Sequence, residues 1–148
     1  MTSMVDTLEL IYGATLSHDV DGIVVTFRDL DNVFSWGDTE EEAIFNAREA
    51  LDGVLNAMAA HDQGVPLPSK MQEGEIGIAV SPEVAAPVML HTLRMQQQKS
   101  LVQVATTLGK SYQAYQRMEK TGSNLTLKSL KLAAAALGAT VEIRFKTS

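Results

Sequence analysis

The spacing of apolar residues divides the chain into strands and one long helix, followed by several short helices. Residues 8–17, 23–27 and 33–36 are rich in apolar or β-branched side chains and are separated by polar, turn-forming residues. This pattern predicts three strands that follow one another as a meander. Residues 75–80 have the same character and predict a fourth strand.

The segment between the third and fourth strands has helical spacing. Thr39 and Glu42 have the spacing of a capping box, in which each side chain satisfies a backbone N–H group at the start of a helix. Apolar residues then recur every three or four positions, as in an amphipathic helix: Ile44, Ala47, Leu51, Val54 or Leu55, and Met58. We expect this helix to end near His61, before the extended segment 65–68, which contains two prolines.

The rest of the chain predicts four short helices and a last strand. Residues that favour the N-cap position stand before helix-forming segments: Ser81, Ser100, Ser111 and Thr126. Ser100 and Gln103 form a second capping box, and Gly109 ends the helix that they begin. The helix after Thr126 ends before Gly138 and has its apolar positions at Leu127, Leu130, Ala134 and Leu137. Beyond it, alternating apolar and charged residues predict a terminal strand: Val141, Glu142, Ile143, Arg144, Phe145 and Lys146.

These elements predict an α+β chain of two domains with opposite charge. Residues 1–80 form a small antiparallel sheet with one helix, and they carry 15 acidic and 3 basic side chains, a net charge of −12. Residues 81–148 form an all-α domain that ends in a short strand, with 3 acidic and 9 basic side chains, a net charge of +6. The first domain therefore suits a cationic protein partner, and the second suits a polyanion such as DNA.

Composition excludes several other classes of protein. The chain has no cysteine, so it has neither disulfides nor cysteine-based zinc sites. No apolar run approaches the roughly 20 residues that span a bilayer, and the N-terminus lacks the pattern of a signal peptide. We expect a cytoplasmic protein with no membrane partner. We also expect no cofactor. We expect no metal, because the three histidines lie outside any ligand spacing: His18, His61 and His91.

Residues 101–118 match the spacing of a helix-turn-helix. The first helix of that motif needs a small residue at the fifth position, here Ala105, where the two helices approach closely. The turn needs a residue that accepts positive φ at the ninth position, here Gly109. Apolar residues stand at the inward positions: Val104, Leu108, Tyr115 and Met118. The alternative is a helical bundle that has this spacing by coincidence.

The second helix of such a motif lies in the major groove of DNA. Glutamine reads adenine and arginine reads guanine there through paired hydrogen bonds. The candidate DNA-binding residues on this helix are Ser111, Tyr112, Gln113, Gln116 and Arg117. Lysines around it would contact phosphates and so orient the domain: Lys99, Lys110, Lys120 and Lys128.

Two sets of residues carry resemblances to known families. Glu119 follows the second helix, and Leu130-x-x-Ala133 leads to Ala136-Leu137-Gly138. With these residues, the chain from about 88 to 143 resembles the Cro/Xre repressor family.

The first half carries, in order, Asp21-Gly22, Asp29-Leu30, Gly37-Asp38-Thr39-x-x-Glu42-Ala43 and Pro66-x-Pro68-Ser69. This ordered set, joined to a helix-turn-helix, resembles the HicB antitoxin family.

The second resemblance implies a partial ribonuclease H-like fold that binds and masks the HicA toxin, a small basic mRNA interferase. Candidate toxin contacts are Asp29, Asp31, Trp36 and Asp38. Trp36 belongs to the segment Phe34-Ser35-Trp36, which is bulkier than is usual for the family. We expect Trp36 in the core, with an exposed contact as the alternative.

We therefore predict an antitoxin, and not an enzyme, that neutralises a HicA-like toxin and represses its own operon by binding operator DNA. It would act as a homodimer, or as a tetramer of two dimers, because one recognition helix buries too little surface for specific affinity. The terminal strand would pair between subunits or return to the first sheet. Two alternatives are a stand-alone repressor that senses a small ligand and a metal-dependent nuclease. Against the nuclease, four aspartates fall in turns, where local hydrogen bonds favour them: Asp19, Asp21, Asp29 and Asp31.

Overall fold

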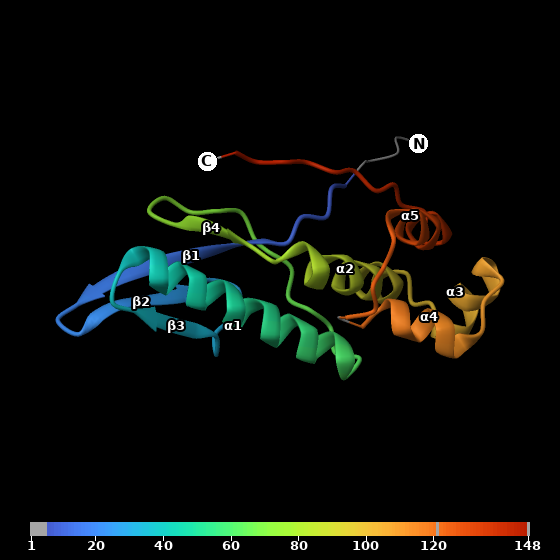
Figure 1. Ribbon diagram of the computed structural model, residues 1–148, viewed down its shortest axis with the longest axis horizontal. Helices are drawn as coiled ribbons and strands as arrows, with labels where there is room; N and C mark the ends of the chain where they lie inside the picture. The colour runs from blue at the N-terminus through green and yellow to red at the C-terminus, as the bar shows by residue number, and fades with distance from the viewer. Residues whose placement is uncertain (1–5, 121, 148) are drawn as a thin grey trace.

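The computed structural model describes residues 6–120 and 122–147. Four antiparallel strands form one sheet in the order β3-β2-β1-β4, one helix covers a face of that sheet, and four shorter helices follow (Figure 1). The expected α+β class, with a small antiparallel sheet followed by a helical region, is confirmed. The elements are β1 (Ile11–Asp19), β2 (Gly22–Phe27), β3 (Phe34–Gly37), α1 (Glu40–Ala60), β4 (Ile76–Ala79), α2 (Pro82–Gln96), α3 (Leu101–Leu108), α4 (Tyr112–Met118) and α5 (Leu127–Ala136).

Strands β1 and β2 form a tight hairpin that sets the register of the sheet. Asp19 pairs with Gly22 across a two-residue turn, and Gly22 has a φ of 144°, which a residue without a Cβ adopts without strain. Side chains then alternate between the two faces of the sheet. Tyr12, Ala14 and Val25 point toward α1 and are fully buried. The strands are thus held with one apolar face toward the helix.

Helix α1 covers the sheet with one stripe of its surface. Its fully buried residues follow helical spacing: Ala43, Ala47, Leu51 and Leu55. Thr39 caps the helix by accepting a hydrogen bond from the N–H of Glu42. The helix approaches β3 so closely that a Cβ at Gly37 would lie 2.4 Å from the backbone nitrogen of Ala43. Glycine at position 37 therefore permits the packing of α1 on β3.

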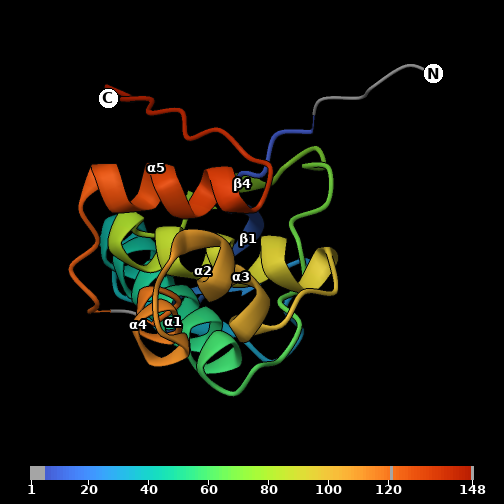
Figure 2. The ribbon, with the colours of Figure 1, turned by 90° about the vertical axis from the view of Figure 1, so that its right-hand side faces the viewer.

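Helix α2 contributes to two separate cores. Val84 and Val88 pack with the sheet and α1, whereas Leu90 packs with α3, α4 and α5. Figure 1 shows α2 between the sheet-bearing half and the group of short helices, and Figure 2 shows α5 lying across that group. Ser81 precedes α2 as expected, but its side chain makes no capping bond, and its N–H donates to the Asp52 carboxylate instead.

The expectation of a terminal strand is wrong for the single chain. Residues 139–147 are extended, but none of them belongs to a strand. Ile143 is 61% exposed and Phe145 is 91% exposed. The segment runs back from α5 toward the sheet-bearing half (Figure 1), where Arg144 forms an exposed ion pair of 2.7 Å with Glu9. A strand needs a partner for its backbone groups, and this segment has none among the described residues of the chain.

Side chains of α1 bind one backbone carbonyl on each edge strand of the sheet. Asn46 donates a hydrogen bond to the carbonyl of Trp36 on the edge strand β3, at 2.9 Å. Arg48 donates to the carbonyl of Ala79 on the other edge strand, β4, at 3.2 Å. Each edge strand thus has a backbone acceptor that is already occupied, which disfavours pairing with a further strand.

One expected apolar position of α5 is also wrong. Leu127 is 67% exposed, although Ala134 and Leu137 are buried as expected. Ala133 takes the additional buried position and packs in the second core. The buried stripe therefore begins further along the helix than the spacing of leucines suggests.

We expect the two substitutions Gly37→Ala and Gly53→Ala to have opposite effects on stability. At Gly37 the new methyl group would meet the backbone of α1, and overpacking of this kind costs roughly 1–3 kcal/mol. At Gly53, within α1, a Cβ would meet nothing within 4 Å, so alanine should stabilise the helix by about 0.5–1 kcal/mol. Urea unfolding of the full chain measures both changes. A Gly37→Ala protein as stable as the unmodified chain would contradict the close packing of α1 on β3.

Candidate nucleic-acid and protein interfaces

Helices α3 and α4 form the helix-turn-helix, and their local chemistry agrees with the expected motif. Ser100 and Gln103 make both bonds of the capping box, and Gly109 ends α3 in the left-handed conformation with a φ of 66°. The Ser111 side chain accepts a hydrogen bond from the N–H of Ala114 and so begins α4. The expected inward residues pack in the second core, where Leu108 is partly buried and the others are buried: Val104, Ala105, Tyr115 and Met118.

The expected DNA-binding residues lie on the accessible side of α4. Gln113 and Arg117 are exposed, Tyr112 is 40% exposed and Gln116 is half-buried. Ser111, the N-cap of α4, is exposed at the start of the same helix, and the four candidate lysines are also exposed: Lys99, Lys110, Lys120 and Lys128. The structure therefore brings the candidate base contacts together on one short helix, with cations at its ends and on neighbouring elements.

The stretch of chain that contains α4 carries little negative charge. Between residues 84 and 141 the sequence has a single acidic residue, Glu119, and its side chain is buried. The exposed side chains of this stretch are therefore neutral or cationic. Such a surface can approach a phosphate backbone without electrostatic repulsion.

Glu119 fixes the end of α4 to α2 through its carboxylate. Its two carboxylate oxygens accept hydrogen bonds from Nε and Nη2 of Arg94, at 2.8 and 3.0 Å. Burial opposes the charge on Glu119, but His91 and Arg94 together hold the pKa of this carboxyl below its usual range. The resemblance to Cro/Xre repressors had pointed to Glu119, but sequence reasoning missed its partners. No local pattern indicated them, because they lie 25 and 28 residues away along the chain.

On the sheet-bearing half, the edge strand β3 exposes two aromatic side chains. Phe34 is 68% exposed and Trp36 is 46% exposed. They pair with Thr26 and Val24 and lie on the face of the sheet opposite to α1. The expectation that Trp36 belongs to the core is therefore wrong, and the alternative of an exposed position is confirmed. The physical reason is the close approach of α1 at Gly37, which turns the adjacent Trp36 outward by strand alternation.

Sequence reasoning also missed Phe34. It stands two residues before Trp36, so any assignment of one side chain to a face of the strand applies to the other. The expected aspartates near this strand differ in their roles. Asp31 and Asp38 are exposed, whereas Asp29 accepts hydrogen bonds from the backbone N–H and the hydroxyl of Ser69, both at 2.8 Å. Asp29 thus ties the loop before β4 to the turn after β2.

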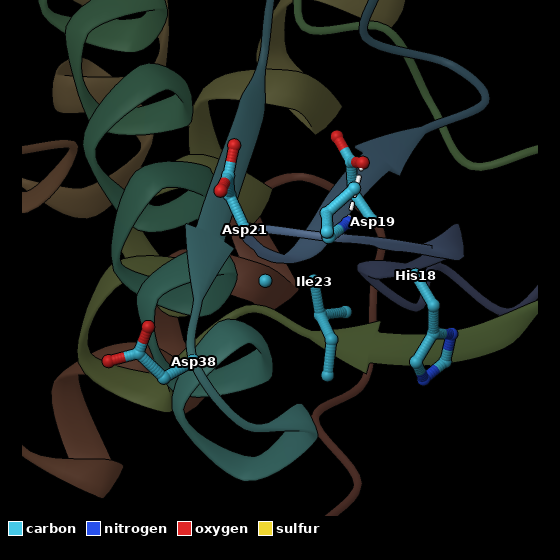
Figure 3. A pocket seen from close by; sticks show the side chains of 7 residues that line it. His18, Asp19, Asp21, Ile23 and Asp38 are labelled. Atoms are coloured by element: carbon cyan, nitrogen blue, oxygen red, sulfur yellow. Dashed lines mark hydrogen bonds between the residues drawn. The ribbon is translucent and has the colours of Figure 1, made fainter.

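The acidic residues at the hairpin tip do not converge on one point. Asp19, Asp21 and Asp38 line a shallow, open depression, and Figure 3 shows their carboxylates pointing apart. The Asp19 carboxylate accepts a hydrogen bond from the N–H of Val20, which is a turn-forming role. Among the described residues, no group of three or more histidine and carboxylate side chains could hold a metal ion.

The described part of the chain contains no helix that is both long enough and apolar enough to cross a membrane.

Both halves match known families of proteins. Residues 11–88 match the model described as the HicB_like antitoxin of bacterial toxin-antitoxin systems, and residues 90–143 match a helix-turn-helix model. Antitoxin HicB 2 of Photorhabdus laumondii is 30% identical over 132 residues, which cover 89% of this chain and 94% of that relative. Antitoxin HicB of Escherichia coli strain K12 is 28% identical over 117 residues, covering 79% of this chain and 85% of the relative.

A likeness to the crystal structure of the Burkholderia pseudomallei antitoxin HicB has a TM-score of 0.37 and 24% identity, and it covers 51% of this chain and 63% of that one. The family match to the first half alone spans more than half of the chain. The chain therefore belongs to the HicB-like antitoxin family of bacterial toxin–antitoxin systems, and it carries a helix-turn-helix domain of the Cro/Xre type.

Proposed function

We propose that this protein neutralises a small basic mRNA-interferase toxin of the HicA type and represses its own operon by binding promoter DNA. The observation that carries the proposal is the separation of charge along one chain: a net −12 in residues 1–80 and a net +6 in residues 81–148. An acidic half attracts a cationic protein and repels nucleic acid, while a basic half does the reverse. Both activities place the protein in the cytoplasm. No step of either requires the antitoxin to act as an enzyme.

The toxin-binding surface is assigned to the outer face of β3. Phe34 and Trp36 supply aromatic area of the kind that dominates protein–protein binding energy. Asp31 and Asp38 lie exposed before and after this strand and would steer a basic partner toward it. Asp29 supports the surface by holding Ser69 and its loop. The toxin's RNA-binding surface, which must be cationic to hold RNA, is then the surface that becomes covered.

The DNA-binding surface is assigned to α4. Gln113 and Arg117 are one helical turn apart and are exposed on the same side of α4. A single short recognition helix buries too little surface for specific affinity, so two copies would bind two half-sites. The extended segment 139–147 offers a means of forming that dimer, because its Ile143 and Phe145 are exposed and its backbone belongs to no strand.

The toxin surface can be tested with the substitutions Phe34→Ala and Trp36→Ala. Each removes an aromatic anchor, so we expect each to weaken toxin binding by at least about 2 kcal/mol, close to 30-fold in Kd. Phe45→Ala on α1, which also removes an exposed aromatic side chain, is the matched control and should leave Kd unchanged. Calorimetric titration with the product of the adjacent gene measures the change. Equal losses in the three variants would show that β3 is not the contact.

Charge reversal at the same surface should act mainly on the rate of association. Asp31→Lys and Asp38→Lys each remove an exposed negative charge, so we expect slower association with the toxin and little change in dissociation. The difference from the unmodified protein should shrink as salt rises, because exposed charges are screened over about 10 Å at 0.1 M. Surface plasmon resonance at two salt concentrations measures it. A loss that salt leaves unchanged would argue against electrostatic steering.

The recognition helix can be tested with Gln113→Ala and Arg117→Ala. Each should cost roughly 1–3 kcal/mol of specific DNA binding and relax one operator position, because a bidentate base contact is lost. Lys110→Ala is the contrasting variant, and it should weaken all sequences alike and lower the salt slope by about one unit. Gel-shift titrations on promoter and unrelated DNA separate these results, and toxin neutralisation should survive all three changes. An Arg117→Ala protein with unchanged affinity and sequence preference would refute the assignment.

The dimer can be tested with Ile143→Asp and Phe145→Asp introduced together. Two charges on this segment would make pairing with a second copy unfavourable, so we expect monomers in multi-angle light scattering at micromolar concentration and weaker operator binding. The matched control is Leu127→Asp, which places a charge at an exposed apolar position of α5. If the unmodified protein is itself monomeric at these concentrations, the proposed pairing is wrong.

A further inference from the structure

The two halves of the molecule are joined through α2, and this helix has a weak point near the place where its packing changes. Pro87 lies inside α2 and has no N–H to donate to the carbonyl of Glu83, one turn earlier. Val84 and Val88 pack in the first core, and Leu90 packs in the second. A helix that lacks one internal hydrogen bond bends there more easily than elsewhere.

A buried cluster of charged and polar groups lies one helical turn after Pro87, beyond Val88, which still packs in the first core. His91 is 1% exposed, and its Nε2 lies 2.8 Å from the carbonyl oxygen of Gln63, in the loop after α1. Arg94, also buried, donates from Nη2 to the carboxylate of Asp62 in the same loop, at 2.9 Å. Arg94 also holds Glu119 at the end of α4. The cluster therefore connects the end of α1, the second half of α2 and the recognition helix.

The geometry around His91 favours its protonated form. A carbonyl oxygen only accepts hydrogen bonds, so the proton between Nε2 and Gln63 belongs to the imidazole. The other ring nitrogen, Nδ1, is buried without a hydrogen bond, 3.5 Å from Oε1 of Glu119 and 3.7 Å from Oδ1 of Asp62. A lone pair at Nδ1 would face two carboxylates, whereas a proton there would be attracted by both.

The other ionisable groups around the ring do not reverse this preference. Arg94, on α2 itself, opposes a second positive charge, but it is paired with the same two carboxylates. Tyr115 of α4 faces Glu119 and stays neutral, since burial and Glu119 raise its pKa. The interaction with Glu119 raises the pKa of His91 above its ordinary value, against the effects of burial and of Arg94.

We propose that protonated His91 is a latch that fixes the helix-turn-helix on the sheet-bearing half, and that loss of its proton frees movement about Pro87. In the latched state the two halves move as one body. In the unlatched state the attraction of Nδ1 to Asp62 and Glu119 is lost, and among the described residues only the bonds from His91 Nε2 to Gln63 and from Arg94 to Asp62 still join the loop after α1 to α2. With fewer links, α4 changes its orientation relative to β3 together with the second half of α2. The latch goes beyond the proposed binding activities, and it does not depend on the identity of the toxin or the operator.

The direction of the pH effect follows from the raised pKa. The protonated latch is fully present below the ordinary histidine pKa of about 6.5, and it is lost as pH rises through the higher pKa of the folded protein. The two halves should therefore be coupled in mildly acidic solution and uncoupled in alkaline solution.

The test is methyl relaxation and histidine side-chain NMR on the full chain across pH 5.5 to 9. We expect the His91 resonances to titrate with a midpoint above about 6.5. We also expect methyl groups of the two cores to report one correlation time at low pH and a shorter one for the second core at high pH. His91→Gln retains a donor for Gln63 but carries no charge, so it should show the uncoupled behaviour at every pH.

A second variant tests the same proposal if His91→Gln does not fold. The Asp62 carboxylate is 67% exposed, so Asp62→Asn should fold normally, lower the His91 midpoint and uncouple the halves at a lower pH. Glu49→Gln, which removes an exposed carboxylate of α1 outside the cluster, is the matched control and should behave as the unmodified chain. A His91 midpoint at or below about 6.5, or one correlation time for both cores at every pH, would overturn the proposal.

Discussion

The burial of Arg94 is the constraint on which the arrangement of the second half depends. A guanidinium removed from water must find a partner for its N–H groups, or the desolvation cost is several kcal/mol. Arg94 meets this requirement with Glu119, with Asp62 and with the backbone carbonyl of Lys99, at 3.1 Å. Three segments therefore meet around one side chain, and Arg94 fixes α4 on the second half of α2. The interior bonds of Arg94 thus support the position of the exposed face of α4.

Local chemistry made much of the fold predictable from the sequence. Ser100 with Gln103, and Gly109, act through hydrogen bonds and backbone angles within a few residues, so their roles in α3 could be read directly. The helix-turn-helix followed from such signals together with helical periodicity. The antiparallel sheet and α1 followed from the change of period between strands and helix. The family matches then confirmed both resemblances.

The errors share a physical cause, which is dependence on distant parts of the chain. Strand alternation alone does not decide which face of β3 is covered, and this is why the sequence places Trp36 in the core. In the structure α1 covers the face of β3 opposite to Trp36. Phe145 and its neighbours have a strand pattern, but a pattern does not supply a pairing partner. The cluster around His91 joins residues from three elements, and no spacing along the sequence indicates that they meet.

The side chains of α1 that occupy the sheet edges have a consequence for how such proteins tell their partners apart. Because Asn46 and Arg48 each occupy a backbone carbonyl, on β3 and on β4, a foreign strand that pairs with either edge competes with a side chain for that carbonyl. Backbone pairing depends little on sequence, so it would let one antitoxin bind the toxin of a different toxin–antitoxin system. Where backbone pairing contributes less, the choice between toxins depends on exposed side chains. A few substitutions there change the preferred partner. Several such pairs could therefore coexist in one cell on the same scaffold without cross-reaction.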